Sequence, residues 1–201
     1  MLKPALRLLN ERVMFPRRYA FLTRELSPFL QSGQTLLDVG SSNGRLVRSL
    51  TAGLPDVAVA GVDVHVQPGA LIPIEKYDGR TLPFDDDSFD CTLLVDVLHH
   101  ADDPTALLQE ATRVSRRHVL IKDHYYVTRL DWQVLKWADR GGNAPHDIVL
   151  PFHYFTLPEW KTAIAACGLS VLFEKPFTNY AFDPCKHVIY HLGKDRSAKS
   201  W

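Results

Sequence analysis

The chain has 201 residues, of which 46% are hydrophobic, 23% are charged and 10% are aromatic. This composition excludes a disordered polymer, a collagen-like chain and a small disulfide-stapled scaffold, and the length fits one domain with a sizeable core. Basic and acidic residues number 23 each, so the formal net charge is zero and the basic excess typical of nucleic-acid-binding proteins is absent.

The cysteines and the hydropathy pattern indicate a cellular compartment. The three cysteines show neither a CxxC pair nor a metal-ligand spacing, which is typical of unreactive thiols in a reducing environment. No run approaches the roughly 18 apolar residues that a membrane helix needs. Charges at Lys3, Arg7 and Glu11 interrupt the segment where a signal peptide would be apolar. We therefore expect a cytoplasmic protein without a membrane segment.

Short aliphatic runs alternate with segments of helical periodicity along the chain. The first predicted elements are two helices, separated by Pro16. Their ranges are 3–13 and 17–30. Seven strands are predicted at 35–39, 57–64, 71–77, 90–95, 118–122, 169–174 and 187–192. Four further helices are predicted. The first ends near residue 52, and the second begins with Asp103-Pro104 as its capping residue and first helical position. The third covers 127–139, and the fourth runs from the capping box Thr156–Glu159 to Gly168.

This alternation predicts an α/β protein with a Rossmann-like, doubly wound sheet and helices on both faces. Most strands should be parallel, because helices connect them. The last two strands lack an intervening helix, so we expect an antiparallel C-terminal strand at one edge.

The first predicted strand leads into a turn of small residues before the next helix starts. Open α/β sheets bind ligands at the carboxyl ends of such strands, where free N–H groups face the site. The dinucleotide fingerprint would need glycines at 40, 42 and 45, but Ser42 and Arg45 occupy two of these positions. A nicotinamide or flavin cofactor is therefore disfavoured, and the nearby Asp38 favours a ligand with positive charge.

Three aspartates end or follow three successive predicted strands: Asp38, Asp63 and Asp78. Asp63 can accept two hydrogen bonds from a ribose diol, and Asp78 can accept one from the exocyclic amine of an adenine. A single aspartate at such a place is usually a capping or turn residue. Together the three predict a site for a positively charged adenosine derivative.

Six blocks in this order resemble the class I S-adenosylmethionine-dependent methyltransferases, of the small methyltransferase type 11 kind. The blocks are LLDVGSSNG (36–44), GVD (61–63), DGRTLPFDDDSFD (78–90), VLHHADDP (97–104), LLQEATRV (107–114) and VLIKDH (119–124). They lie within residues 30–125, and their order makes the resemblance specific. We expect a single methyltransferase domain over 1–201, with an N-terminal helical lid at 1–30 and a substrate-side insertion, rich in aromatic residues, at 125–155.

The resemblance implies S-adenosyl-L-methionine as the cofactor. The cofactor-binding residues that it implies are Tyr19, Asp38, Gly40, Ser41, Ser42, Asn43, Gly44, Asp63, Val64, Asp78, Gly79 and Asp96. Residues 38–44 would hold the methionine part, Asp63 the ribose hydroxyls, and Asp78 with Gly79 the adenine. Asp96 would lie against the methionyl amino group, and Tyr19 would reach the carboxylate.

The chain departs from the family pattern at two places. Ser42 stands where the family has its middle glycine, so the backbone approach to a ligand is tighter there. The turn of Pro-Gly-Gly type before the fifth strand is replaced by residues 115–117, which predicts a shorter connection.

Catalytic candidates follow the fourth and fifth predicted strands. Methyl transfer is an in-line displacement that depends on alignment, and an acceptor of high pKa also needs a base. Histidine titrates near neutral pH, so the candidates are His124, Asp123 and His100, with packing or capping as the alternative role of each. A metal site built from Asp123, His124 and another histidine is conceivable. The nine histidines include no ligand-spaced pair, however, so no metal site is predicted.

The sequence thus predicts methyl transfer to an O, N or C nucleophile of a small-molecule acceptor. One alternative is a protein that binds S-adenosylmethionine without methyl transfer. A second alternative is a methyltransferase acting on RNA or protein, which only the basic N-terminal segment supports. The third alternative is a nicotinamide oxidoreductase. No membrane or nucleic-acid partner is expected. The identity of the acceptor and the oligomeric state stay open.

Overall fold

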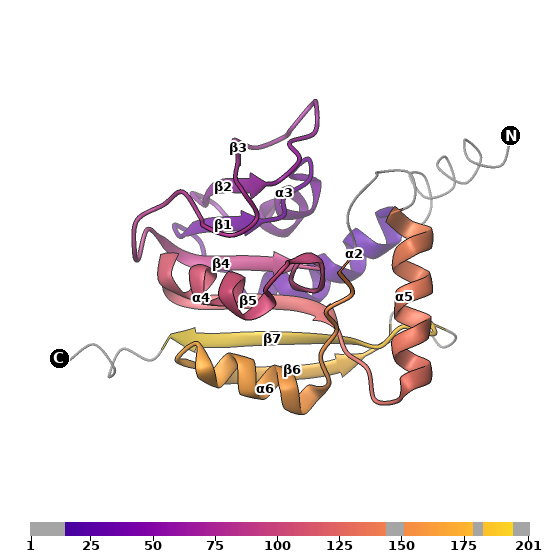
Figure 1. Cartoon of the computed structure of the whole chain (residues 1–201). Helices are drawn as coiled ribbons and strands as arrows, with labels where there is room; N and C mark the ends of the chain where they lie inside the picture. Colours follow the sequence, from indigo (N-terminus) through magenta and orange to yellow (C-terminus); the bar gives the residue numbers. More distant parts are fainter. Residues whose placement is uncertain (1–14, 144–150, 179–182, 195–201) are drawn as a thin grey trace, which may run out of the picture.

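The computed structural model describes residues 15–143, 151–178 and 183–194, so the predicted helix at 3–13 lies outside it. A seven-stranded sheet forms its centre, in the order β3-β2-β1-β4-β5-β7-β6 (Figure 1). The strands are β1 (Thr35–Val39), β2 (Ala58–Asp63), β3 (Ile74–Lys76), β4 (Phe89–Val95), β5 (Ser115–His124), β6 (Leu169–Phe177) and β7 (His187–Lys194).

The strands from β1 to β5 pair in parallel, and β7 pairs antiparallel with both β5 and β6. The predicted α/β, Rossmann-like sheet is therefore confirmed. One detail differs from the expectation, because the last strand lies inside the sheet and β6 forms the edge. The strand order reverses between β1 and β4, and the carboxyl ends of these two strands flank the point where such folds bind ligands.

Helices cover both faces of the sheet. They are α2 (Phe15–Leu26), α3 (Arg45–Thr51), α4 (Pro104–Val114), α5 (Arg129–Asn143) and α6 (Leu157–Ala166), with the short 3₁₀ turns η2 (Ser27–Phe29) and η3 (Leu98–His100). On one face α4 and α6 bury Leu107, Leu108, Trp160 and Ile164. On the other, α2 and α3 bury Leu22, Leu26, Val47 and Leu50. In β5, Val119 and Ile121 join the first core and Leu120 joins the second, because successive side chains of a strand point to opposite faces.

The helix starts and stops follow the local sequence signals. The Asp103 side chain accepts hydrogen bonds from two backbone N–H groups at the start of α4. Thr156 and Glu159 form the predicted capping box of α6, and Gly168 after this helix has φ +67°. Pro16 lies in the first turn of α2 instead of before it, a position where its missing N–H costs nothing.

Two connections position the site. As expected, the connection before β5 is short: α4 leads directly into the strand, and the buried Ser115 hydroxyl donates a hydrogen bond at 2.7 Å to the Ala111 carbonyl. After β5 the chain forms α5, which stands beyond the carboxyl ends of β4 and β5 in Figure 1. The buried Leu135 of α5 packs with Tyr154 and Cys185. Among the described helices, none combines the length and the apolar character that a membrane span requires.

Candidate active site

The turn after β1 is held closely against its neighbours. Gly40 has φ +72°, and its N–H donates to the Val62 carbonyl of β2 at 2.8 Å. A Cβ atom at Gly40 would lie 2.5 Å from Cγ2 of Val97, so only glycine fits here without displacing the segment after β4. The Ser41 hydroxyl donates to the Asp38 carbonyl at 2.7 Å. Backbone atoms thus line this turn where a ligand would approach.

Ser42 adopts the left-handed backbone conformation that favours glycine, with φ +55°. A serine in this conformation carries some conformational cost that a glycine would not. Its N–H donates to Asp63 Oδ2 at 2.7 Å, and the His65 N–H donates to Asp63 Oδ1 at 2.8 Å. Asp63 thereby ties the end of β2 to the turn. The turn ends with Asn43 Oδ1, which accepts from the Arg45 N–H, and Gly44, the N-cap of α3.

The Asp78 side chain stabilises the turn that follows it in the chain. Its Oδ1 accepts the N–H groups of Arg80 and Thr81, each at 2.8 Å, and these bonds lower the pKa of the carboxyl. The next residue, Gly79, has φ +82°, and a Cβ atom there would lie 3.2 Å from Cγ1 of Val64. The segment after β3 therefore lies against the exposed side chain of Val64 at the end of β2.

Asp38 is 5% exposed and forms no ion pair within the described ranges. Burial raises the pKa of its carboxyl to about 7, and the neighbouring Asp63 acts in the same direction. A carboxyl in this state is stabilised by any cation that binds beside it.

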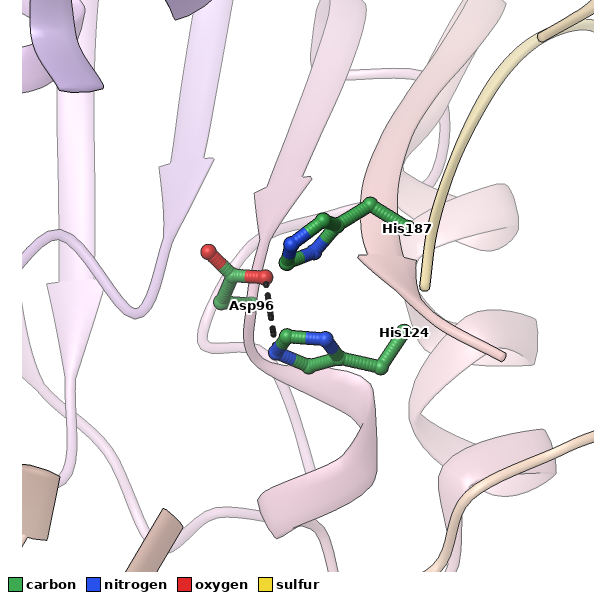
Figure 2. A group of neighbouring side chains, drawn as sticks. All are labelled: Asp96, His124 and His187. Carbon is green, nitrogen blue, oxygen red and sulfur yellow. Dashed lines mark ion pairs between the residues drawn. The ribbon is translucent and has the colours of Figure 1, made fainter. Parts of the chain in front are cut away.

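Asp96, after β4, is the centre of a charge cluster. Its Oδ2 forms an ion pair with Arg18 of α2, while its Oδ1 lies 2.5 Å from Lys122 Nζ and 3.6 Å from His124 Nε2. Figure 2 shows the rings of His124 and His187 beside this carboxylate. Burial acts to raise the pKa of Asp96, but Lys122 and Arg18 hold it well below its ordinary value. Tyr19, next to Arg18 on α2, is half-buried.

The catalytic candidates lie beside this cluster but differ in what they contact. Asp123 is 1% exposed, and its carboxylate accepts the N–H groups of Leu98 and His124 and lies 2.5 Å from His99 Nδ1. This geometry favours a positioning role for Asp123 over contact with a substrate. His124 is 13% exposed, and its buried Nδ1 has no hydrogen-bond partner among the described residues. Burial, and next Lys122, lowers the pKa of His124 well below its ordinary value.

His100 lies against His99, with 3.9 Å between the ring centroids. Burial, and next the charge of His99, lowers its pKa to about 4, so its ring is neutral near pH 7. His99 itself is nearly buried between Asp123 and Asp139, and although burial opposes it, these carboxylates raise its pKa to about 10.

Comparison with known proteins supports the resemblance seen in the sequence. Residues 37–121 match the methyltransferase domain family. A curated relative, the 27-O-demethylrifamycin SV methyltransferase of Amycolatopsis mediterranei (strain S699), is 31% identical over 101 residues. Over this part the chain is similar to the class I S-adenosylmethionine-dependent methyltransferases. The aligned residues make up 43% of this chain and 36% of the relative, so the match spans about a third of that protein's length.

Solved structures of similar fold cover most of the chain. A chain from the Haloferax volcanii complex of the Trm112 methyltransferase activator with its partner has a TM-score of 0.73 at 17% identity, and 94% of each chain is covered. The [4+2]-cyclase SpnF has a TM-score of 0.64 at 14% identity, with 89% of this chain and 80% of that chain covered. At these identities the likeness concerns the fold alone.

S-adenosylmethionine is the cofactor of this family, and the residues present fit it. The buried carboxyl of Asp38 suits a ligand that carries positive charge. The Gly40 turn is bare backbone, packed so closely on Val97 that a side chain would not fit.

The raised pKa of Asp38 leads to a stability prediction. Its folded-state pKa of about 7 lies above its ordinary value of 3.8, so between these values the folded protein binds more protons than the unfolded chain. Stability should therefore fall as the pH rises through this range. We predict that Asp38→Asn raises the free energy of unfolding at pH 8 by up to roughly 4 kcal/mol.

Urea-induced unfolding measures this effect. At pH 4 the variant and the original protein should unfold at similar urea concentrations, and at pH 8 the variant should unfold later. The exposed Asp102, changed to Asn, is the matched control and should show no such pH dependence. Equal midpoints of Asp38→Asn and the original protein at pH 8 would contradict the prediction.

Sequence reasoning missed two charged residues of this region, Lys122 and Asp139. Lys122 lies inside a predicted strand, where its single charge amid aliphatic residues is the available signal. Asp139 lies on a helix, and nothing local separates it from an ordinary exposed charge. Arg18 belongs to the predicted N-terminal lid, and His99 follows the fourth predicted strand together with the candidate His100.

Proposed function

We propose that the protein transfers the methyl group of S-adenosylmethionine to an O, N or C nucleophile of a small-molecule acceptor. The observation that carries this proposal is the placement of three aspartates at the carboxyl ends of three adjacent parallel strands: Asp38 near the end of β1, Asp63 at the end of β2 and Asp78 shortly after β3. When bound, the cofactor supplies an electrophilic methyl group on a sulfonium.

We assign the cofactor contacts as the sequence suggested. Asp38 and the turn of residues 40–44 hold the methionine part, and Asp63 with Val64 binds the ribose. Asp78 and Gly79 border the adenine, for which the exposed Val64 side chain offers an apolar surface. Asp96 and Tyr19 would lie at the amino and carboxylate ends of the methionine part. The ion pair between Arg18 and Asp96 supports this, because it brings α2 to that edge.

We also propose that the acceptor binds beyond the carboxyl ends of β4 and β5, within one methyltransferase domain. The N-terminal segment and residues 125–155 would cover it. Two contacts support this: Arg18 of α2 reaches Asp96, and Tyr154 packs with Leu135 of α5. The first part of the proposed lid, residues 1–14, lies outside the described residues. The buried Leu22 and Leu26 make the described part of α2 a packed element of the core.

His124 is the residue that we propose as the general base. Its lowered pKa keeps the imidazole neutral near pH 7, so it can accept a proton. We predict that His124→Ala lowers kcat by about 10²–10⁴-fold and leaves cofactor affinity nearly unchanged. The rate of S-adenosylhomocysteine formation and calorimetry with that product measure the two quantities.

A matched control is available on the same strand. His118 lies near the amino end of β5, toward the opposite end of the strand from His124, so His118→Ala should leave turnover unchanged. If His124→Ala has small and equal effects on kcat and on the affinity for S-adenosylhomocysteine, His124 is a structural residue and not the general base.

Incubation of the folded protein with methyl-labelled S-adenosylmethionine and fractionated metabolites tests the function itself. The expected result is S-adenosylhomocysteine together with a labelled small molecule. Binding of the cofactor without turnover by any fraction would favour the alternative of a binding protein. Label in RNA or protein, with strong sensitivity to salt for RNA, would favour the macromolecular alternative. A folded protein that ignores both cofactor forms at millimolar concentration would refute the proposal.

A further inference from the structure

Three side chains beside the proposed acceptor site have the composition of a metal-binding group. His99 comes from η3 after β4, His124 ends β5, and Asp139 lies in α5. Each offers one ligand atom, and these three atoms all lie within 4.8 Å of one another. His99 Nε2 and Asp139 Oδ2 are 3.5 Å apart. Two imidazoles and one carboxylate occur as ligands in catalytic zinc sites and non-heme iron sites, where further positions stay open.

Two of the three ligands have outer partners that orient them. His99 Nδ1 lies 2.5 Å from Asp123 Oδ1, so the carboxylate fixes the tautomer that presents Nε2 to a metal ion. The Tyr154 hydroxyl donates to Asp139 Oδ2. Metal-binding histidines and carboxylates usually have such partners, and their rings and oxygens are then held in place before an ion binds.

The third ligand has an unused polar atom. The Nδ1 atom of His124 is buried and has no hydrogen-bond partner in the described part of the chain. The three side chains are 3%, 13% and 12% exposed, in the order His99, His124, Asp139, so the group is enclosed but not sealed. A divalent ion on His99 Nε2 would face the carboxylate of Asp139, while Asp123 would hold the opposite nitrogen of the ring.

A second trio nearby is a poorer site. Asp96, His124 and His187 also bring three ligand atoms within 4.8 Å of one another (Figure 2). The ammonium of Lys122 already lies 2.5 Å from Asp96 Oδ1 and 3.0 Å from His187 Nδ1. A divalent ion there would meet this cation at close range, and like charges repel. Lys122 also acts electrostatically on His124, which both trios share, but the two ligand atoms that it contacts directly, on Asp96 and His187, belong to this second trio.

We propose that His99, His124 and Asp139 bind one divalent transition-metal ion, and that Asp123 and Tyr154 orient its ligands. Because imidazole suits zinc, cobalt and iron better than magnesium or calcium, Zn²⁺ and Co²⁺ are suitable probes. The inference goes beyond methyl transfer and does not depend on it, since metal binding is measured without cofactor or acceptor. His124 would act as the general base only in the metal-free protein, because the imidazole lone pair that binds an ion cannot also accept a proton.

Titration of the chelator-treated, full-length protein with Co²⁺ tests the site. We expect one ion per chain, visible absorption bands from Co²⁺, and displacement of Co²⁺ by Zn²⁺, which binds such ligands more tightly. Asp139→Asn and His124→Ala should each weaken binding by more than about 100-fold, and Asp123→Asn by about 10–100-fold. His118→Ala and Asp102→Asn are the controls and should bind as the original protein does.

Three results would overturn the proposal. The first is a folded protein that binds neither ion at millimolar concentration. The second is unchanged Co²⁺ binding in Asp139→Asn, a nearly isosteric variant in which folding is checked by thermal unfolding. The third is loss of binding in His187→Ala together with retention in Asp139→Asn, which would assign the ion to the trio with Asp96.

Discussion

Replacing Asp63 by alanine should weaken the binding of S-adenosylhomocysteine about 100-fold, because two hydrogen bonds to a carboxylate together contribute about 3 kcal/mol or more. The carboxylate would bind the ribose diol from the end of β2. The same substitution removes the acceptor of the Ser42 and His65 N–H groups, so the turn beside the ligand loses its support as well. Isothermal titration calorimetry with S-adenosylhomocysteine measures the effect.

A second variant separates these two causes. Asp63→Asn keeps one oxygen that can accept the Ser42 N–H but loses the charge, so its affinity should lie between those of the original protein and of Asp63→Ala. Asp102→Ala serves as the control, because Asp102 is an exposed carboxylate distant in sequence from Asp63. Unchanged affinity in Asp63→Ala would refute the ribose assignment.

Replacing Asp96 by asparagine should lower the free energy of unfolding by about 3–5 kcal/mol, the usual cost of leaving a buried charge without its partner. Lys122 is 2% exposed, and its ammonium lies 2.5 Å from the Asp96 carboxylate. The substitution keeps an amide oxygen but removes the one carboxylate among the described contacts of this ammonium, so the ion pair is lost. Urea-induced unfolding, followed by circular dichroism, gives the free energy directly.

The double variant Asp96→Asn with Lys122→Met tests the cause. Because it removes both charges together, it should recover most of the stability that Asp96→Asn alone loses. If both proteins are equally unstable, the loss comes from something other than the unpaired ammonium.

The same ion pairs make the protein sensitive to acid. The folded-state pKa of Asp96 lies below its ordinary value, so its contribution to stability is complete above that ordinary value. It is lost as the pH falls toward the folded-state pKa, where the carboxylate takes up a proton.

Local sequence signals were sufficient for the order of strands and helices and for the turn after β1. The cap of Asp103, the capping box at Thr156 and the small-residue turn after β1 each depend on residues within a few positions of one another. The succession of strand and helix also determined that β1, β2 and β3 would bring their aspartates to one edge. The sequence could not show that β7 inserts between β5 and β6, because both of the last strands carry similar hydrophobic patterns and pairing is a long-range choice.

The charged and imidazole groups around Asp96 and His99 are brought together by the tertiary structure alone. Arg18 and Asp96 are 78 positions apart, and Lys122 lies 26 positions beyond Asp96, yet their charges meet at one carboxylate. His99, His124 and Asp139 likewise have no ligand spacing in the sequence and come from three separate elements. Parallel strands joined by helices bring distant residues to a common edge, so spacing along the chain carries no information about these distances. The sequence by itself therefore determined the class of ligand, and only the folded chain determined which charged and imidazole groups stand together beside it.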